Sequence, residues 1–447
     1  MIDLRKIYNA FNADEPLPGT DNARYVDLRK VRGNNDIPKR LLLRIENSNP
    51  RYSYTLLRGH NKCGKTTELN KARLLIDEAG YVTVMFDVAE SAARTFEYTT
   101  VMLLMAAYVI EQLSKRPGLL VRFQGASTKE LADFLVDKEV TATKTGKVDA
   151  EAGVSAKAAP GLITKLLGEF GLSAKLSGGF QNSRSITRKI EGDTAAFKKA
   201  ISAVIQFAND EVKKKGKKGL VIICDGCDKL DISATDEEDR TRDLQISLFV
   251  DHAPDLQSIP CHVIYTVPIS TSANLADHWE HSSEFVPAVP INALPGIDQA
   301  YASAGRALLK EVIVKRIEKE GHQLGEVFES ELLIEGVIDA SGGHISDLLI
   351  LVREAVLQTQ IENKSRIGKM EINQAIRDRL RDYTALIEAK YLKVLTEIEQ
   401  LNTCAASSEY RELVFKRLVL EYISESRTIV DLHPLVKISE PYQKWQR

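Results

Sequence analysis

The positions of apolar residues along the chain predict an α/β protein. Short apolar runs at 54–57 and 81–88 have the length and β-branched composition of strands that are buried on both faces. Between them, residues 66–78 place apolar side chains at helical spacing, and Gly80 is positioned to end that helix. Another helix is predicted at 99–113. Strands and helices that alternate in this way indicate a parallel sheet with right-handed crossovers.

The same alternation resumes further along the chain and then gives way to helices. Further strands are predicted at 220–224, 262–267 and 285–294, with helices at 37–45, 194–215 and 249–257. From about residue 299 the apolar spacing is helical, and long helices are predicted at 346–360 and 371–401. The end of the chain predicts a short helix at 409–415 and a hairpin of strands at 418–423 and 428–432. A short helix followed by a hairpin resembles a winged-helix module.

Residues 119–192 differ in composition from the predicted sheet on either side. Small residues dominate, and the stretches 148–156 and 170–176 alternate with a period of two. We interpret the segment as an insertion, either a hairpin with a short helix or a flexible loop, since small polar composition also marks disorder. The expected order is a lead-in at 1–37, a sheet domain at 38–118 and 193–298 interrupted by the insertion at 119–192, a helical lid at 299–384 and a winged-helix-like module at 385–447.

Composition and charge exclude several classes of protein. Of the 447 residues, 44% are hydrophobic and 27% are charged, which is ordinary for a chain that buries a sizeable core. The net charge of -2 gives no electrostatic case for a nucleic-acid or anionic-membrane partner. No apolar run approaches the roughly 20 residues that span a bilayer, and no signal peptide is apparent. Five cysteines, an odd number, fit a reducing compartment, so we expect a cytoplasmic protein.

The first strand leads directly into the most informative motif of the chain. This is Gly59-His60-Asn61-Lys62-Cys63-Gly64-Lys65-Thr66, with the pattern G-x-x-x-x-G-K-T. The two glycines allow the backbone to turn its amide N–H groups toward phosphate oxygens at the start of a helix. We expect Lys65 to reach the β- and γ-phosphates, the Thr66 hydroxyl to bind Mg²⁺, and Thr67 to contact the α-phosphate. The motif predicts a nucleotide site.

A second motif supports this site. The strand at 220–224 ends in Asp225, and a carboxylate at such a strand end holds Mg²⁺ through water, although it can also cap the next element. The next residue is Gly226, not the Glu that many motor ATPases use to activate water. Asp228 is the nearest substitute for that base; its alternatives are a helix cap or a salt-bridge partner. The basic run at 213–218 is interpreted as a solvated turn, with a phosphate contact as the alternative.

These motifs resemble those of additional-strand (ASCE) P-loop ATPases. The phosphate loop, the stretch Asp225-Gly226-Cys227-Asp228 and the strand at 264–268 look like those of origin-recognition-type AAA+ proteins and of STAND (NACHT-like) signalling ATPases. The resemblance covers about 38–118 and 193–384. It implies that ATP and Mg²⁺ are the cofactors and that Thr266 is a polar sensor at a strand end.

The same resemblance directs attention to arginines of the lid. The stretch 341–348 looks like the AAA+ lid segment that often carries an Arg contacting the γ-phosphate. Here Ser346 stands at that position, and Arg353 is the candidate substitute. Arg306 and Arg316 are candidates for an arginine finger that one subunit supplies to its neighbour, which implies a homo-oligomer.

The leading hypothesis is therefore an ATP-binding and slowly hydrolysing switch or assembly platform that engages a partner or effector protein. A role in bacterial defence is implied by the resemblance to STAND proteins. The alternative is a DNA-associated, origin-recognition-like ATPase that uses the C-terminal module. Charge does not favour this alternative, because residues 385–447 carry nine Lys and Arg against nine Asp and Glu. The intact Lys65, Thr66 and Asp225 argue against an inert scaffold.

Overall fold

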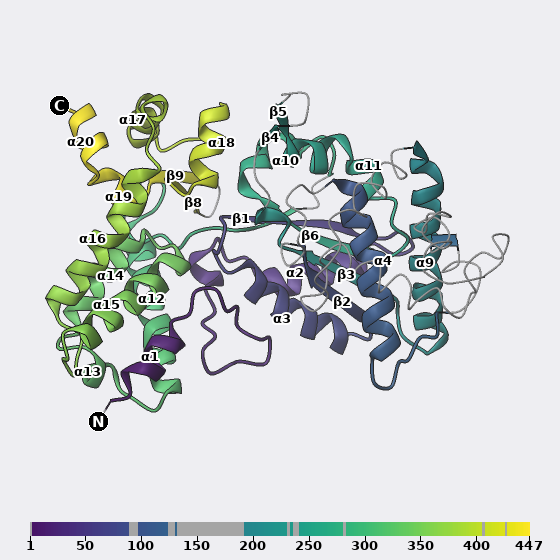
Figure 1. Cartoon of the computed structure of the whole chain (residues 1–447), viewed down its shortest axis with the longest axis horizontal. Helices are drawn as coiled ribbons and strands as arrows, with labels where there is room; N and C mark the ends of the chain where they lie inside the picture. The colour runs from purple at the N-terminus through teal and green to yellow at the C-terminus, as the bar shows by residue number, and fades with distance from the viewer. Residues whose placement is uncertain are drawn as a thin grey trace, which may run out of the picture.

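A computed structural model describes residues 2–88, 97–123, 130–131, 192–229, 233–235, 241–279, 283–404, 407–424 and 427–447. Figure 1 shows a sheet domain on the right and, on the left, a helical lid below the C-terminal module. Most of the predicted insertion at 119–192, including its two alternating stretches, lies outside the described residues. Among the helices of the described residues, none is long and apolar enough to cross a membrane.

The sheet domain is built on five parallel strands. These are β1 (Tyr54–Gly59), β2 (Val82–Asp87), β3 (Leu220–Asp225), β6 (His262–Pro268) and β7 (Ser283–Val286). Their order is β2-β3-β6-β1-β7, and every neighbouring pair is parallel. One strand, β6, thus lies between the phosphate-loop strand β1 and the strand β3 that ends in Asp225. The predicted α/β class with a P-loop-type parallel sheet and an additional strand is confirmed.

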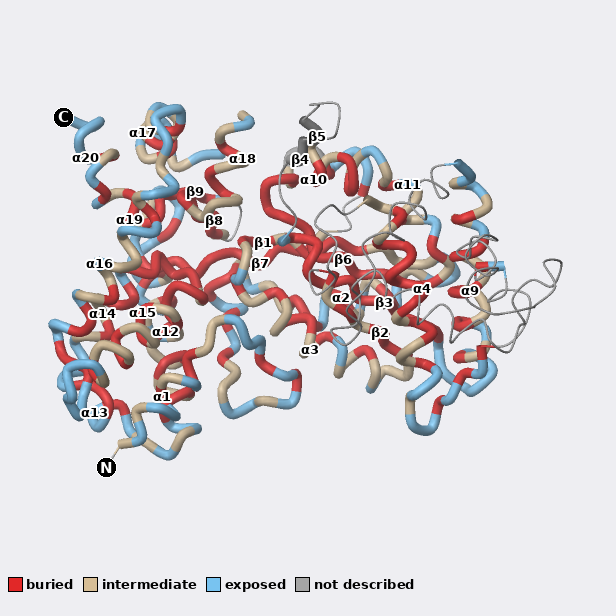
Figure 2. The backbone as a smooth tube through the Cα atoms, viewed as in Figure 1, coloured by how far each residue is buried: buried red, intermediate tan, exposed pale blue. Residues whose placement is uncertain are grey.

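Helices cover both faces of this sheet because successive side chains of a strand point to opposite faces. On β3, Val221 and Ile223 pack with α2 (Ile37–Asn47) and α3 (Lys65–Glu78). Leu220 and Ile222 pack on the other face with two helices. These are α4 (Tyr98–Lys115) and α9 (Thr194–Lys214). The uninterrupted apolar run of β3 is therefore buried on both faces, as Figure 2 shows for the sheet strands.

Two elements of the sheet domain differ from expectation. The helix predicted at 249–257 is divided into a π-helix (Ser247–Asp251) and α11 (Ala253–Leu256), where Pro254 has no N–H to continue the first segment. The strand predicted at 285–294 is wrong in extent, because β7 ends at Val286. The backbone N–H of Ala288 then donates to the Glu421 carbonyl, and that of Val289 to the Gly343 carbonyl. The chain after β7 is thus bonded to the C-terminal module and the lid. Short elements complete this domain: β4 (Ser233–Thr235), β5 (Thr241–Asp243), α10 (Leu244–Ile246) and the 3-10 helices Cys227–Lys229 and Ile269–Asn274.

The lid and the C-terminal module follow in chain order. The lid helices are α12 (Gln299–Lys319), α13 (Leu324–Val327), α14 (Leu332–Ser341), α15 (Ile345–Ile361) and α16 (Lys369–Ala385). The helix predicted at 371–401 is interrupted after Ala385 by a 3-10 turn (Ala389–Tyr391). The module then comprises α17 (Leu392–Leu401), α18 (Ser408–Phe415), β8 (Val419–Ile423), β9 (Thr428–Leu432), α19 (Pro434–Lys437) and α20 (Glu440–Trp445). Strands β8 and β9 pair antiparallel, as the predicted hairpin requires.

The N-terminal lead-in belongs structurally to the lid. Its helix α1 (Leu4–Ala10) and its 3-10 turn (Arg29–Val31) contribute to the lid core. Ile7, Phe11 and Leu28 are buried in one cluster with residues of α12, α14 and α15. The segment between them, which passes the phosphate loop, is anchored to the lid at both ends.

Candidate nucleotide site

The phosphate loop connects the end of β1 to the start of α3, and two glycines set its shape. Gly59 has φ of 156°, and a Cβ atom there would lie 2.6 Å from the Val286 carbonyl oxygen. Gly64 has φ of 105° and is the N-cap of α3, so no side chain caps the first N–H groups of that helix. Uncapped N–H groups at a helix N-terminus form a site for anions such as phosphate. The backbone therefore has the geometry that the motif predicts.

Lys65 is held beneath this loop by three oxygen atoms. Its Nζ lies 2.8 Å from Oδ2 of Asp228, and it donates hydrogen bonds to the carbonyls of Gly59 at 2.9 Å and His60 at 2.6 Å. Burial by itself lowers the pKa of Lys65, but the Asp228 carboxylate outweighs it and the pKa is raised. Lys65 is thus a charged ammonium fixed at the phosphate loop. Of the two alternatives for Asp228, the structure shows the salt-bridge partner.

Thr66 and Asp225 meet at the same end of the sheet. The Thr66 hydroxyl donates to Oδ2 of Asp225 at 2.6 Å. Asp225 is buried, and this burial, together with the nearby Asp228, raises its pKa. A hydroxyl and a carboxylate at hydrogen-bond distance are oxygen ligands of the kind that Mg²⁺ uses together with water and nucleotide phosphates. The residues present therefore fit the metal that the motif implies.

A cavity of about 450 Å³ lies over these residues, within the range of pockets that hold nucleotide-sized ligands. The phosphate loop and β2 form one side of it, and the lid residues Ile345 and Leu349 form another. The N-terminal segment 13–17 crosses it, where the Leu17 N–H donates to the Thr67 hydroxyl at 3.2 Å. No motif marks segment 13–17, and sequence reasoning missed it. Sequence reasoning also missed Lys229, which follows Asp228 and lines the cavity.

Arg316 contributes a buried positive charge to this cavity. Its guanidinium donates to the Val312 carbonyl at 3.1 Å within its own helix, and it forms no ion pair with the residues that the structure describes. Burial lowers its pKa to about 10, and the nearby Arg24 acts in the same direction. A buried cation without a carboxylate is costly unless an anion binds beside it. The part of the cavity next to Arg316 is therefore suited to a negatively charged group.

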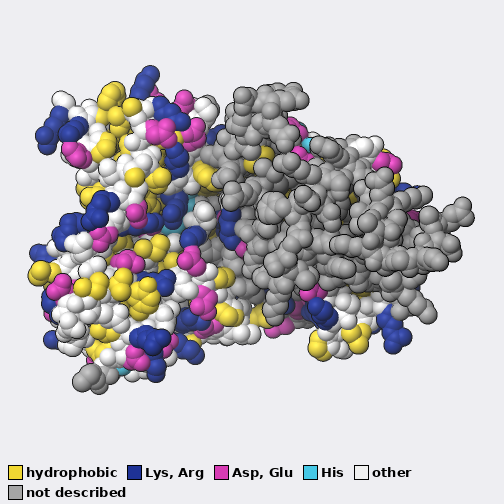
Figure 3. Space-filling model, in the orientation of Figure 1, with side chains coloured by type: hydrophobic (Ala, Val, Ile, Leu, Met, Phe, Trp, Pro, Cys, Tyr) yellow, Lys and Arg dark blue, Asp and Glu magenta, His cyan; other side chains and the backbone are white. Residues whose placement is uncertain are grey.

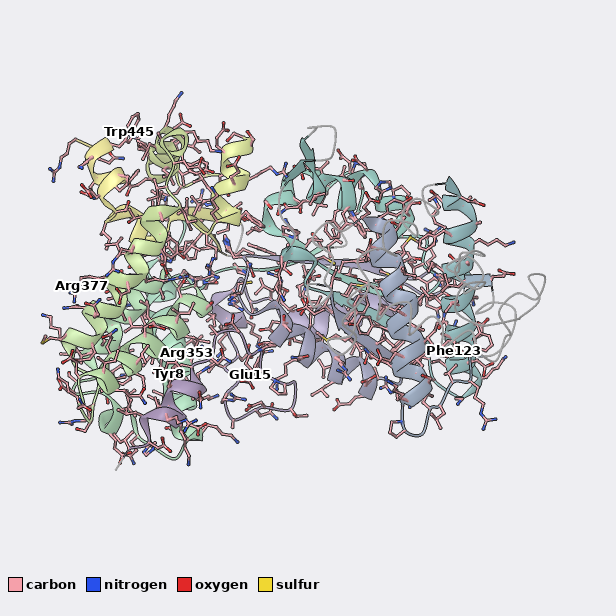
Figure 4. All side chains as sticks on the ribbon, in the orientation of Figure 1. Tyr8, Glu15, Phe123, Arg353, Arg377 and Trp445 are labelled. Carbon is pink, nitrogen blue, oxygen red and sulfur yellow. The ribbon has the colours of Figure 1, made fainter. Side chains whose placement is uncertain are left out.

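The other arginines named from the sequence lie elsewhere. Arg306, the second finger candidate, is held by Glu335 at 3.1 Å and by Asp339 at 2.6 Å within the lid. Arg353 donates to Oδ1 of Asn12 at 3.2 Å, and its guanidinium carbon lies 4.3 Å from the centroid of the Tyr8 ring. Figure 4 labels Arg353 and Tyr8 close to each other. Arg353 thus does not take the place of the missing lid arginine. Any finger role of Arg306 or Arg316 toward a neighbouring subunit stays a prediction.

Two further candidates differ in their access to the cavity. Ser346 lines it, as the resemblance implied, and its buried hydroxyl has no hydrogen-bond partner among the described residues. Thr266 is fully buried on β6, and its hydroxyl lies 3.5 Å from the Cys224 carbonyl. Thr266 is not among the described residues that line the cavity. Its sensor role stays a prediction.

The side chains in the middle of the phosphate loop are divided between the protein interior and the cavity. The Cys63 thiol donates to the Val286 carbonyl at 3.4 Å, and Lys62 forms an ion pair with Asp14 at 2.5 Å. Asn61 and Lys62 line the cavity, whereas His60 is fully buried behind it. These positions can therefore serve a nucleotide through backbone amides.

The His60 ring joins the phosphate loop to the C-terminal module. Its Nε2 accepts a hydrogen bond of 2.9 Å from the Glu421 backbone N–H, and its Nδ1 lies 3.3 Å from the Val414 carbonyl. Nε2 must be the unprotonated nitrogen, so Nδ1 carries the proton and donates. Burial, with His344 nearby, lowers the pKa of His60 well below its usual value. The ring is thus a neutral bridge that fixes α18 and β8 to the loop.

A second histidine joins the loop to the lid. His344 Nε2 donates to the Asn61 carbonyl at 3.0 Å, and its Nδ1 lies 3.0 Å from Asp347 Oδ2. Asp347 is fully buried and also accepts from Arg379 and from the Tyr383 hydroxyl at 2.8 Å. Burial raises the pKa of Asp347, but His344 and its other partners outweigh this and hold it well below the usual range. The C-terminal module and the lid therefore both contact the phosphate loop directly.

Comparisons with known proteins were made on sequence and on structure. No protein-family model and no curated protein matches the chain. Among solved structures, the ORC2 protein of Aeropyrum pernix in its ADP form has 10% identity and a TM-score of 0.41, with 98% of this chain and 96% of that chain covered. The ORC1 protein of the same organism, in complex with DNA, has 11% identity and a TM-score of 0.40, with coverage of 96% and 97%. A Walker-type ATPase of Pyrococcus abyssi has 14% identity and a TM-score of 0.39, with coverage of 95% and 98%. The chain is thus similar in structure to two ORC proteins and to a Walker-type ATPase.

Proposed function

We propose that this chain is a slow ATPase whose nucleotide site controls the docking of the C-terminal module. The observation that carries the proposal is the pair of hydrogen bonds between His60 of the phosphate loop and the backbone of Val414 and Glu421. A loop that changes shape when it binds nucleotide must strain or release these bonds. The occupancy of the site is therefore coupled to the position of the module.

The side chains of the site explain how a triphosphate would be held. Lys65 turns from Asp228 to the β- and γ-phosphates, while Arg316 supplies a second positive charge from the lid side of the cavity. Thr66 and Asp225 would hold Mg²⁺, which neutralises charge on the phosphates. The choice of ATP over GTP rests on the resemblance to P-loop ATPases.

Slow hydrolysis follows from the residues available to activate water. Gly226 offers no side chain, so Asp228 is the general base in this proposal. Asp228 is released for that role when Lys65 moves to the phosphates. It then accepts a proton from the water that attacks the γ-phosphate, and the β–γ bridging oxygen leaves with ADP. In the ion-paired arrangement that the structure shows, Asp228 is not available.

Hydrogen exchange tests the proposed coupling. We expect amides of 408–432 to exchange faster when the protein binds a non-hydrolysable ATP analogue than when it binds ADP, because the module loosens from the loop. Lys65→Ala should abolish the difference together with tight nucleotide binding. Equal exchange in both nucleotide states, with nucleotide binding confirmed by titration, would refute the coupling.

The DNA-associated alternative gains no support from the module. Arg411, the one basic residue of α18, is paired with Asp243 at 2.7 Å and donates to the Ser270 carbonyl at 2.9 Å. The helix therefore faces its own sheet domain. Basic and acidic side chains are interspersed over the visible face of the lid and module in Figure 3. Homo-oligomer assembly, an effector partner and a role in bacterial defence belong to the proposal on resemblance alone.

A further inference from the structure

Two hollows lie at the end of the sheet opposite to the phosphate loop, where strand β1 begins. Their volumes are about 960 Å³ and 360 Å³, and both are lined by Pro50, Arg51 and Tyr52, which precede β1. The six residues of strand β1 lead from this end of the sheet to the phosphate loop. At about 3.3 Å per residue the two sites are roughly 20 Å apart. The hollows, which we call the Arg51 groove, are therefore separate from the nucleotide cavity.

The Arg51 groove has a surplus of positive charge. It is lined by five basic side chains and two carboxylates: Arg40, Arg44, Arg51, Lys213, Lys218, Glu46 and Glu284. Arg40 and Arg44 share Glu284, at 2.7 and 2.5 Å, and Lys218 pairs with Glu46 at 3.1 Å. Arg51 and Lys213 form no ion pair within the residues that the structure describes. A surplus of three positive charges at one groove is distinctive in a chain whose net charge is -2.

Aromatic rings lie between these charges. Tyr52, at the ridge between the hollows, meets the His262 ring edge-on with centroids 5.5 Å apart, and Lys213 Nζ lies 5.8 Å from its centroid. The Tyr52 hydroxyl accepts from the Asn209 amide at 3.1 Å, which fixes the ring. Tyr81 repeats the arrangement, 5.7 Å from His262 and with Lys218 Nζ at 5.4 Å. The groove thus presents cations beside the partly exposed ring of Tyr52, with the rings of Tyr81 and His262 buried behind it.

We propose that the Arg51 groove binds single-stranded nucleic acid. Proteins that bind unpaired strands combine a basic groove along the phosphates with aromatic side chains on which bases stack. Arg51 and Lys213 are free to contact phosphates on either side of the ridge, and Tyr52 offers a partly exposed ring to a base. The exposed side-chain amide of Asn47 supplies a donor and an acceptor for base edges. The basic run at 213–218 then has a phosphate contact, beyond its role as a turn.

Fluorescence anisotropy of the full-length chain with labelled oligo-dT tests the proposal. We expect dT20 to bind, and the Arg51→Glu/Lys213→Glu double variant to weaken it at least tenfold at low salt. The slope of log K against log salt should become shallower by about 1.4, because two phosphate contacts are lost. The matched control is Lys393→Glu/Lys444→Glu, which makes the same charge change at exposed positions of the C-terminal module. An equal loss of affinity in both double variants would overturn the site.

Variants of Tyr52 distinguish the binding of single-stranded nucleic acid, whose bases can stack on the ring, from the binding of any polyanion. Tyr52→Phe keeps the ring and should bind within twofold of wild type, whereas Tyr52→Ala should lose at least about fivefold. Thermal unfolding of each variant shows that it is folded. Equal binding of Tyr52→Ala and Tyr52→Phe, or binding of a duplex as tightly as dT20, would overturn the assignment to unpaired bases.

A length series and Lys65→Ala complete the test. If affinity does not increase from dT2 to dT20, the ligand of the groove is a small nucleotide. That result would refute the proposal that the groove binds single-stranded nucleic acid. Lys65→Ala should leave dT20 affinity unchanged, so this inference stands or fails independently of the ATPase proposal. Competition of an ATP analogue for dT20 at the groove would overturn the separation of the two sites.

Discussion

The ammonium of Lys65 and the carboxylate of Asp228 form a buried ion pair, with Nζ 2.8 Å from Oδ2 and each side chain only 4% exposed. This ion pair occupies both side chains, because Lys65, which is proposed to bind phosphate, is bound to Asp228, which is proposed to activate water. A nucleotide must therefore compete with Asp228 for Lys65. The balance between these two partners sets both affinity and rate in the proposal.

Asp228→Asn separates the two effects. Removing the carboxylate charge frees Lys65, so we expect nucleotide affinity to be equal to or higher than that of wild type. Turnover should fall by roughly 10²-fold or more, the scale of a general-base contribution. Titration of labelled ATP and phosphate release from the same preparation measure both quantities. A variant with wild-type turnover would show that Asp228 is only the ion-pair partner.

The ion pair also predicts a thermodynamic coupling. Lys65→Met abolishes tight nucleotide binding and leaves Asp228 buried without its partner, which typically costs about 3–5 kcal/mol of unfolding free energy. Lys65→Met/Asp228→Asn should regain most of that loss without regaining nucleotide binding. Chemical denaturation of the two single variants and the double variant gives the coupling energy. Additive losses would mean that the contact does not contribute to stability.

Asp225→Asn tests the proposed metal site. The Thr66 hydroxyl can still donate to the amide oxygen, so the loop should remain intact and nucleotide should bind. The amide lacks the negative charge that favours Mg²⁺ next to the phosphates, so the magnesium-dependent part of hydrolysis should be lost. Thr66→Ser, which keeps the hydroxyl, is the matched control and should retain activity. Magnesium-stimulated turnover in Asp225→Asn would refute the assignment.

The variant Arg316→Met tests whether this buried arginine contributes to ATP binding and not to folding stability. A buried guanidinium without a carboxylate partner opposes folding, so we expect the unfolding free energy without nucleotide to be unchanged or slightly higher in the variant. Affinity for ATP should fall at least tenfold, because a cation facing the phosphates is lost. The control is Arg306→Met on the same helix, whose arginine is paired with Glu335 and Asp339. Equal affinity losses in both variants would point to a distortion of α12.

For Arg306 and Arg316, a finger role toward a neighbouring subunit has its own signature. Replacing such an arginine would lower the turnover of the assembled protein and leave the affinity of the isolated chain for ATP unchanged. Measuring specific activity over a range of protein concentrations distinguishes this outcome from the loss of affinity expected for Arg316→Met.

His60 predicts a dependence of stability on pH. Burial keeps the ring neutral in the folded chain, whereas in the unfolded chain it binds a proton below about pH 6.5. Its contribution to stability is therefore complete above that pH and is lost as the pH falls toward the lowered pKa of the folded state. His60→Gln should flatten the dependence between pH 6.5 and 5 by up to about 1.4 kcal/mol per pH unit. Denaturation curves for both proteins across this range provide the test, and parallel pH profiles would contradict it.

The local parts of the site could be predicted from the sequence because they are coded in consecutive residues. The phosphate loop needs two glycines, a lysine and a threonine at fixed spacing between a strand and a helix, and the structure places all of them as expected. The strand before Asp225 is apolar throughout because it is buried on both faces. The parallel sheet itself was predicted, whereas its strand order is known only from the structure.

The remaining parts could not be predicted, because they depend on how distant elements pack. Arg316 was a candidate for reaching a neighbour, and only the orientation of α12 shows that it faces its own cavity. His60 occupies a variable position of the motif, and nothing in its spacing indicates a contact with Glu421, 361 residues further along the chain. The apolar run at 285–294 suggested a strand throughout, yet after Val286 the backbone bonds to the module and the lid.

The order in which the ribosome makes this chain limits when the candidate nucleotide site can form. Helix α1 packs against α15, which is translated much later, and the loop residue His60 is bonded to Val414 and Glu421, 354 and 361 residues further along the chain. Contacts between positions this far apart form late in folding, because the chain between them must be closed first. A nascent chain that has emerged only as far as the lid lacks the partners of His60. We infer that the candidate nucleotide site reaches its finished arrangement only after the C-terminal module has been translated and has docked on the loop.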